Sequence, residues 1–260
     1  MYLRAAHAEH HLPTLRAFIR ANPLGIFTTA LPSPAQTFPL LQSSHVPFLL
    51  DIGDESSETE LGTLRAHIAR ANPQSKAMIE SLSSQKENGT TTGPRTLEQD
   101  VLILFNAPVH HYVTPKFYRA TKPATGKVVP TWDYAAVQVY GRAKIYFDSK
   151  DPATDAYLAK QVADLSRMAE TEVMGYEKPW EVADAPAPYV DALKKAIVGV
   201  EVEVTSMAGK WKMSQELAEG DREGVVKGFE ALGSEVGSEM ARVVKERGEL
   251  MERKKAEAKQ

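Results

Sequence analysis

Hydrophobic residues near the start of the chain recur with a helical period. Leu12, Leu15, Phe18 and Ile19 lie at helical spacing, which predicts one amphipathic helix that ends before Pro23. Short apolar runs separated by turn-forming residues follow this helix, and such runs are typical of strands. We predict strands over residues 24–31, 45–52, 61–68, 101–105 and 112–113. A single α+β domain with added helices accounts for this pattern.

The second half of the chain predicts further strands and another helix. Residues 128–139 and 141–147 are strand-like and nearly contiguous, so we predict a tight antiparallel hairpin. Asp151-Pro152 has the form of a helix start, and apolar residues recur at helical spacing between residues 158 and 168. Residues 201–205 alternate acidic and apolar side chains, as a strand with one wet face does.

Composition suggests where the domain ends. We predict one domain over residues 1–221 and a charged helical extension over residues 222–260, whose last ten residues carry no apolar stripe. Serine, threonine, glycine and asparagine dominate the segment between Ser81 and Gln99, and such residues bury little apolar surface. We therefore predict a mobile surface insertion at about residues 82–99.

The overall composition narrows the class of protein. Of the 260 residues, 43% are hydrophobic and 25% are charged, as in ordinary soluble globular proteins. No apolar run is long enough for a membrane span and no signal-type segment follows the first residues. We therefore expect a cytoplasmic or nuclear protein without a membrane partner. The formal net charge of -3 and the pI near 6.2 make direct nucleic-acid binding doubtful.

The chain contains no cysteine. This excludes disulfides, thiolate nucleophiles, iron–sulfur clusters and thiolate-bound zinc, so any redox chemistry requires a bound cofactor. His110 and His111 are adjacent, and adjacent side chains in an extended segment point to opposite faces, so we predict no metal site there. No nucleophile elbow, phosphate-binding glycine-rich loop or dinucleotide fingerprint is present, which argues against the commonest hydrolases, NTPases and NAD-binding enzymes.

An aromatic-rich strand follows a turn signal in the segment VVPTWDYAAVQV, which begins at Val128. Pro130 biases the preceding residue toward extended geometry, and Trp132 and Tyr134 then stand at the start of the strand. Their rings are able to stack on a flat ligand. The alternative is that they anchor a core strand, which is the commoner use of such a segment.

Three further motifs accompany this strand. They are HVPFLLD from His45, GTLRAHIARANPQ from Gly62, and DAPAPYVDALKKAIVGVEVEV from Asp184 together with GKWKMSQ from Gly209. In order and separation the four motifs resemble those of the PaiB-type FMN-binding negative transcriptional regulator family, over about residues 40–225. The resemblance implies an antiparallel split β-barrel related to the pyridoxamine-phosphate oxidases. It also implies that FMN is held where the two subunits of a homodimer meet.

In the motif GTLRAHIARANPQ, Arg70 directly follows a predicted strand. Two residues later, Asn72 and the proline after it mark the predicted start of a helix. A guanidinium beside helix N-terminal amides suits the dianionic phosphate of FMN, whereas an isolated arginine more usually lies on the surface without a ligand. The resemblance favours the phosphate role for Arg70, with Ala69 and Asn72 beside it. His67 either contacts the flavin edge or fills the mouth of the barrel. His45 is expected at the pyrimidine end of the flavin, mainly through backbone groups.

Trp132 and Tyr134 face one side of their strand, and Thr131 and Asp133 face the other. The resemblance implies that Thr131, Trp132 and Tyr134 lie at the flavin. The family usually has asparagine and histidine where this chain has Asp133 and Gln138. Because an ionised aspartate has no donor, the first change weakens a role of this side chain as donor to a flavin carbonyl.

The motif GKWKMSQ places Lys210, Lys212 and Ser214 on one face of an extended segment and Trp211 on the other. Lys212 and Ser214 are candidates to complete a phosphate or ribityl site from the second subunit, and a solvated strand face explains the lysines equally well. Gln215 follows them and is a candidate to hydrogen-bond the flavin ring.

Three functions stay open at this point. The first is an FMN-binding split-barrel homodimer that uses the flavin as a redox cofactor, as an FMN-dependent oxidoreductase would, or as a sensed ligand. The second is a transcriptional regulator without bound flavin, although no helix-turn-helix with a basic recognition helix is recognisable. The third is a haem-binding or haem-degrading split-barrel protein, since histidines are available to ligate iron.

Overall fold

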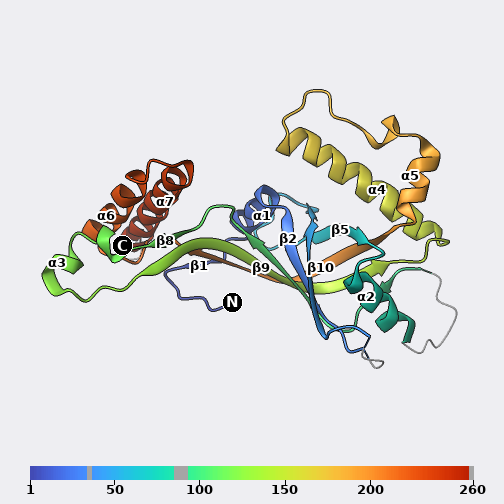
Figure 1. Ribbon diagram of the computed structural model, residues 1–260, viewed down its shortest axis with the longest axis horizontal. Helices are drawn as coiled ribbons and strands as arrows, with labels where there is room; N and C mark the ends of the chain where they lie inside the picture. Colours follow the sequence, from blue (N-terminus) through green and yellow to red (C-terminus); the bar gives the residue numbers. More distant parts are fainter. Residues whose placement is uncertain (34–36, 85–92, 258–260) are drawn as a thin grey trace. The chain divides into compact units, whose positions relative to one another are not determined.

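The chain forms two compact units (Figure 1). The computed structural model describes residues 1–33, 37–84 and 93–257. The barrel unit comprises Leu12–Phe105 and Gln138–Met207, and the arm unit comprises Met1–His11, Asn106–Val137 and Ala208–Gln260. Among the described helices, none is both long enough and apolar enough to cross a membrane.

Two long strands, β9 (Thr131–Tyr146) and β10 (Ile197–Lys212), pass from one unit into the other. The arm unit is therefore assembled from three segments that are far apart in the sequence. The boundary expected between residues 221 and 222 falls inside helix α6 (Glu219–Glu230). The predicted boundary was based on the charged composition of the end of the chain. The two units, in contrast, divide within β9 and β10.

The sheet of the barrel unit curls back on itself. Its other strands are β2 (Leu24–Ala30), β3 (Leu41–Pro47), β4 (Leu49–Asp51), β5 (Thr63–Ala69), β6 (Arg95–Thr96) and β7 (Val101–Asn106). The strand order is β3-β2-β7-β9-β10-β5-β4, with antiparallel pairing of β2 to β3 and β7, and of β5 to β4 and β10. Only Phe48 separates β3 from β4, so the two ends of this order are consecutive in the chain. The result is an antiparallel split barrel, which confirms the predicted α+β fold class.

Aromatic and aliphatic side chains fill the barrel. Phe27, Phe48 and Phe105 are at most 2% exposed and meet edge to face, with ring centroids 6.1 and 5.9 Å apart. Leu64 and Ala66 of β5 are fully buried on the inner face of the sheet. Because side chains alternate along a strand, Arg65, which lies between these two residues, and His67, which follows Ala66, point to the outer face.

Helices cover the outside of the barrel. They are α1 (Leu12–Ala21), α2 (Pro73–Ser84), α4 (Pro152–Met168) and α5 (Ala187–Lys194), with a π-helical turn (Ala169–Val173) and a 3-10 turn (Val182–Asp184) between the last two. Asp151 caps α4, since its Oδ1 accepts a hydrogen bond from the backbone N–H of Ala153 at 3.0 Å, as the sequence predicts. α4 lies against the outer face of β5, and α5 lies beside α4 (Figure 1).

The hairpin predicted over residues 128–147 is wrong, because β9 is one continuous strand of 16 residues. Gly141, at the break between the two predicted strands, lies where β9 passes close to β10. A Cβ at this position would lie 2.4 Å from the carbonyl oxygen of Glu203. Glycine therefore serves a close approach of two strands here and not a turn.

The insertion predicted at residues 82–99 is too long at both ends. α2 continues to Ser84, with Leu82 fully buried, and β6 pairs with β9. Leu97 is also fully buried. Two leucines in a polar segment thus provide apolar anchors that its composition hides. Residues 85–92 of the predicted insertion lie outside the described part of the chain.

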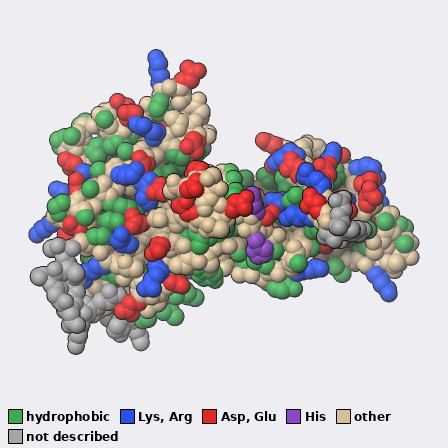
Figure 2. Space-filling model, turned by 180° about the vertical axis from the view of Figure 1, so that it is seen from behind, with side chains coloured by type: hydrophobic (Ala, Val, Ile, Leu, Met, Phe, Trp, Pro, Cys, Tyr) green, Lys and Arg blue, Asp and Glu red, His purple; other side chains and the backbone are tan. Residues whose placement is uncertain are grey.

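The arm unit combines short strands with a pair of helices. Besides parts of β9 and β10 it contains β1 (Ala8–Glu9), β8 (His111–Val113), a 3-10 turn (Pro115–Phe117), α3 (Thr121–Thr125), α6 and α7 (Glu235–Glu257). α6 and α7 lie side by side (Figure 1). Val225 and Phe229 of α6 and Met240 and Val244 of α7 are buried. Acidic and basic side chains are intermixed over this pair, at the upper right of Figure 2. The predicted helical C-terminal extension corresponds to α6 and α7.

Candidate functional site

Arg70 directly follows β5, and its guanidinium is fixed by backbone carbonyls. Nε donates to the carbonyl of Lys195 at 3.1 Å, and Nη2 donates to those of Phe147 at 2.6 Å and Ile197 at 3.4 Å. Nη1 makes no hydrogen bond within the described part of the chain. The side chain is therefore a positioned cation that keeps two N–H donors for an anion.

Asn72 caps α2, which changes the predicted anion site. Its Oδ1 accepts a hydrogen bond from the backbone N–H of Gln74 at 2.9 Å, and its Nδ2 donates to Ser44 Oγ on β3 at 3.0 Å. The start of this helix thus has fewer unpaired amides than the sequence suggested. His45 follows Ser44 on β3 and is exposed. Asn72 and His45 therefore belong to one part of the barrel surface.

His67 and Ala69 lie on the outer face of β5, where they line a cavity of about 500 Å³. This α4–α5 cavity lies between β5, the start of β10, α4, α5 and residues 180–185. Within the described part of the chain the imidazole of His67 has no hydrogen-bond partner, and its Nδ1 is buried. Burial lowers the pKa of His67, so the ring is neutral near pH 7.

Asp133 is fully buried in the arm unit. Its Oδ2 accepts a hydrogen bond from Ser214 Oγ at 2.8 Å, and its Oδ1 lies 3.7 Å from Lys212 Nζ. Burial raises the pKa of this carboxyl to about 6, although Ser214 and Lys212 both act to lower it. Ser214 itself has a positive φ of 56°. Asp133 is therefore a buried ionisable group on β9, in contact with the candidate residues Lys212 and Ser214.

Lys212 connects the start of β9 with the end of β10. Its Nζ donates to Thr131 Oγ1 and to the carbonyl of Trp132, the latter at 2.9 Å. With Asp133 also nearby, this ammonium group has its partners within the arm unit. Thr131 and Lys212, both candidates from the sequence, are therefore brought together by contact with each other.

Ser214 and Gln215 are 1% and 4% exposed. Gln215 Oε1 accepts a hydrogen bond from the backbone N–H of Met213 at 2.7 Å. Its Nε2 donates to the carbonyl of Ala6 at 3.0 Å and to that of Trp211. Both side chains thus hold the end of β10 in place, and their polar groups are already engaged.

Trp132 belongs to an exposed aromatic group. It is 49% exposed, and its Nε1 donates to His110 Nδ1 at 3.1 Å. Its ring centroid lies 5.8 Å from that of His110 and 6.2 Å from that of Tyr112. Tyr134, two residues along the strand, lies under Lys210, whose Nζ is 5.2 Å from the ring centroid.

The sequence reasoning missed His110 and Tyr112 as members of this aromatic group. They join Trp132 because β8 pairs with β9 in a register that sets Tyr112 opposite Trp132. In the sequence, the adjacent histidines His110 and His111 were considered only as possible metal ligands. A pairing between strands some 20 residues apart leaves no local signal that would have found the group.

The comparison with protein families gives a match over residues 1–206 to the family described as "Putative FMN-binding domain". This range includes the barrel unit except for its last residue, Met207. It also includes all the sequence candidates except Lys212, Ser214 and Gln215.

Several known proteins are similar to the chain. An uncharacterized protein of Aspergillus fumigatus is 57% identical over 264 residues, which cover 98% of this chain and 100% of that protein. The protease synthase and sporulation protein PAI 2 of Bacillus subtilis is 28% identical over 155 residues, which cover 59% of this chain and 67% of that protein. The solved flavocytochrome Anf3 from Azotobacter vinelandii has a TM-score of 0.45 at 13% identity, with 81% of this chain and 72% of that chain covered.

Proposed function

The chain belongs to this family of FMN-binding domains, and we propose that it is a flavoprotein in which Arg70 recognises the phosphate of FMN. Membership of the family confirms the resemblance seen in the motifs and confirms FMN as the cofactor. A bound isoalloxazine ring supplies electron-transfer chemistry, so the protein contributes binding, orientation and exclusion of water. The observation that carries the residue assignment is the fixed guanidinium of Arg70.

The surroundings of Arg70 fit the phosphate end of FMN. Three backbone carbonyls hold the guanidinium of Arg70 in place, so little side-chain entropy is lost when Nη1 binds an anion. Ser214 and Gln215 fit less well, because their hydrogen bonds are made within the arm unit.

Replacing Arg70 should weaken FMN and leave riboflavin almost unchanged. Loss of a charge-assisted contact costs about 1.5–3 kcal/mol, so Arg70→Ala should raise the Kd of FMN by about ten- to a hundredfold. Riboflavin has no phosphate and should bind the variant and the parent protein alike. Both Kd values are measured by titrating apo-protein with flavin and following flavin fluorescence.

A control variant makes this titration specific. Arg167→Ala removes another arginine of the barrel unit, one that is 70% exposed and paired with Glu181, and should leave both Kd values unchanged. Equal losses of the two flavins in Arg70→Ala would assign Arg70 to the fold instead of the phosphate. No saturable signal at micromolar FMN with the parent protein would contradict the assignment altogether.

The same protein preparation separates a redox role from a sensing role. FMN-dependent oxidation of NADH or NADPH would support an oxidoreductase. Binding of FMN without turnover with any electron donor would support a regulator that senses the flavin. Neither role requires a protein nucleophile, because the flavin carries the chemistry.

We also propose that the chain is a homodimer, and we expect a mass of about 57 kDa, twice the 28.6 kDa of one chain, in sedimentation equilibrium. Leu40 and Leu41, beside and at the start of β3, are 57% and 66% exposed, which favours association through this part of the barrel. Leu41→Glu should shift the equilibrium toward monomer. Val236→Glu, at an exposed position of α7, should not do so. A stable monomer of the parent protein at low micromolar concentration would refute the dimer.

A further inference from the structure

We propose that the α4–α5 cavity of the barrel unit binds a small, neutral, aromatic molecule with one hydroxyl or carbonyl group. This site is additional to the contacts proposed for FMN, and its occupancy does not depend on them. Its volume of about 500 Å³ lies within the range of about 300–1,000 Å³ that is usual for small-molecule pockets.

The walls are almost entirely apolar. Val162 and Leu165 of α4 form one side, and Ile197 at the start of β10 lies on the sheet side. Trp180 and Tyr189 supply two aromatic side chains from the segment before α5 and from α5 itself. Aliphatic and aromatic walls of this kind favour a flat apolar ligand.

Several of these side chains are left uncovered. Trp180 is 47% exposed, Tyr189 59% and Leu193 49%, although all three line the cavity. Hydrophobic side chains gather among charged ones in this region, at the upper left of Figure 2. A molecule that fills the cavity would remove apolar surface from water, which is the main source of affinity for such ligands.

The cavity offers no unpaired charge within the described part of the chain. The one lysine in its wall, Lys194, has its Nζ 2.8 Å from an oxygen of Asp155 and 3.1 Å from one of Asp191. His67 is neutral near pH 7, because burial lowers its pKa. An ionised ligand would therefore lose its hydration without compensation, so the ligand is neutral and the phosphate of FMN is excluded.

His67 supplies the specific polar contact. Neither of its ring nitrogens makes a hydrogen bond within the described part of the chain, and Nδ1 is buried. A buried polar group without a partner is costly, and a neutral imidazole both donates and accepts hydrogen bonds. One hydroxyl or carbonyl on the ligand would complete the hydrogen bonding of this ring. The apolar remainder of the ligand would face Trp180 and Tyr189.

The test uses 2-naphthol and naphthalene as probes on the full-length chain, with binding followed by equilibrium dialysis. We expect saturable binding of one 2-naphthol per chain, with naphthalene about fivefold weaker because it lacks the hydrogen bond. His67→Leu should reduce this fivefold preference to less than about twofold while naphthalene still binds. Equal affinity of the parent protein for the two probes would refute the role of His67.

Two tryptophan variants of α5 locate the site. Val190→Trp places an indole in the cavity and should weaken 2-naphthol at least about tenfold, whereas Ala192→Trp, exposed on the same helix and outside the lining, should not. Leu193→Glu, at a half-exposed lining position that tolerates a polar side chain, should also weaken the probe if Val190→Trp fails to fold. Equal effects of Val190→Trp and Ala192→Trp would refute the location.

The relation to FMN and to dimerisation gives two further decisive outcomes. Saturation with FMN should leave the Kd of 2-naphthol unchanged. Competition between the two would show that the cavity belongs to the flavin, and release of monomers by 2-naphthol would show that a second chain covers it; either result overturns the proposal. If FMN does not bind at all, the naphthol titration still reports on the cavity, so the two proposals fail independently.

Discussion

Arg65→Ala is expected to lower the free energy of unfolding by about 2–4 kcal/mol. The side chain of Arg65 is 8% exposed, and its removal leaves polar partners at the contact between β5 and α4 without a cation. Removing one member of a buried ion pair usually costs about 3–5 kcal/mol. Asp51 and Asp164 keep 49% and 35% of their side chains exposed, so water offsets part of this cost.

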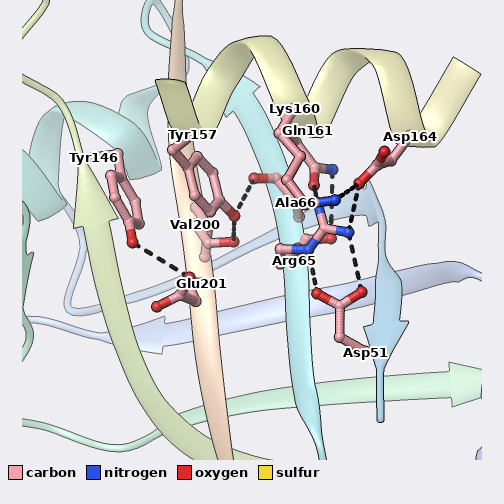
Figure 3. Close-up of polar contacts among 10 residues, drawn as sticks. All are labelled: Asp51, Arg65, Ala66, Tyr146, Tyr157, Lys160, Gln161, Asp164, Val200 and Glu201. Atoms are coloured by element: carbon pink, nitrogen blue, oxygen red, sulfur yellow. Dashed lines mark hydrogen bonds and ion pairs between the residues drawn. The ribbon is translucent and has the colours of Figure 1, made fainter. Parts of the chain in front are cut away.

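Figure 3 shows how Arg65 connects β4, β5 and α4. Nε and Nη2 donate to the two carboxylate oxygens of Asp51, and Nη2 also donates to Asp164 Oδ2 at 2.8 Å. Nη1 donates to Oε1 of Gln161, which is fully buried, at 3.1 Å. Burial alone would lower the pKa of Arg65, but Asp51 and Asp164 raise it overall. The guanidinium therefore stays charged at every pH of interest.

A second contact on α4 lies beside this one. The hydroxyl of Tyr157 donates to the carbonyl of Val200 at 2.7 Å, and its ring stacks on that of Tyr146 with centroids 3.9 Å apart (Figure 3). A Cβ at Gly199 would lie 2.5 Å from the Tyr157 ring, so glycine is needed on β10 for this packing. Because Tyr157 still holds α4, Arg65→Ala should destabilise the protein without unfolding it.

The measurement is urea unfolding followed by circular dichroism, with Arg242→Ala as the matched control. Arg242 also has two acidic partners, Glu239 and Glu246, but it lies on α7 and is 54% exposed. Its loss should cost less than about 1 kcal/mol, because exposed ion pairs contribute little. A similar loss of unfolding free energy in both variants would mean that the contribution of Arg65 to stability does not depend on its burial.

Asp133→Asn is expected to stabilise the protein by up to about 3 kcal/mol near pH 8. The pKa of Asp133 is about 6 in the folded chain, against an ordinary value of 3.8, because burial disfavours the charged carboxylate. The folded state therefore holds the proton more tightly than the unfolded state. The free energy of unfolding consequently falls as the pH rises from about 4 to about 6, and stays lower above that range.

Asparagine removes the charge and keeps the shape, so the stabilisation should disappear below about pH 4, where Asp133 is neutral in both states. Thermal unfolding of both proteins between pH 4 and pH 8 measures this dependence. Asp100→Asn makes the same chemical change at an exposed position and controls for net charge. A loss of Tm at pH 8 would show that the contact of the carboxylate with Lys212 outweighs its burial. A gain in Tm that is equal at all pH values would show that ionisation of Asp133 is not its cause.

Local sequence signals predicted the elements whose causes are local. α1 ends at Ala21, before Pro23, and α4 begins at the Asp151 cap, as expected from capping and periodicity. The same reasoning failed at Gly141, because the neighbour that requires a glycine there is on β10, some 60 residues away. It also failed at Leu97, a single buried residue in a polar segment.

The candidate site divides in the same way. The motif around Arg70 marked an exposed bend after a strand, but the carbonyls that fix its guanidinium belong to residues 147, 195 and 197. Ser214 and Gln215 were candidates because of their polar side chains. Their burial could not be predicted from the sequence, because it results from contacts of the end of β10 with Asp133 and with the N-terminal segment.

The sequence by itself determined the family, the cofactor and the α+β class, because motifs, strand periodicity and the lack of cysteine are properties of the chain as written. The tertiary structure alone decided that His67 faces an apolar cavity and that Asp133 is buried with a raised pKa. It also decided that Trp132 stands with His110 and Tyr112. The physical reason is that burial, charge compensation and ring contact depend on neighbours that strand pairing and helix packing bring from distant parts of the chain.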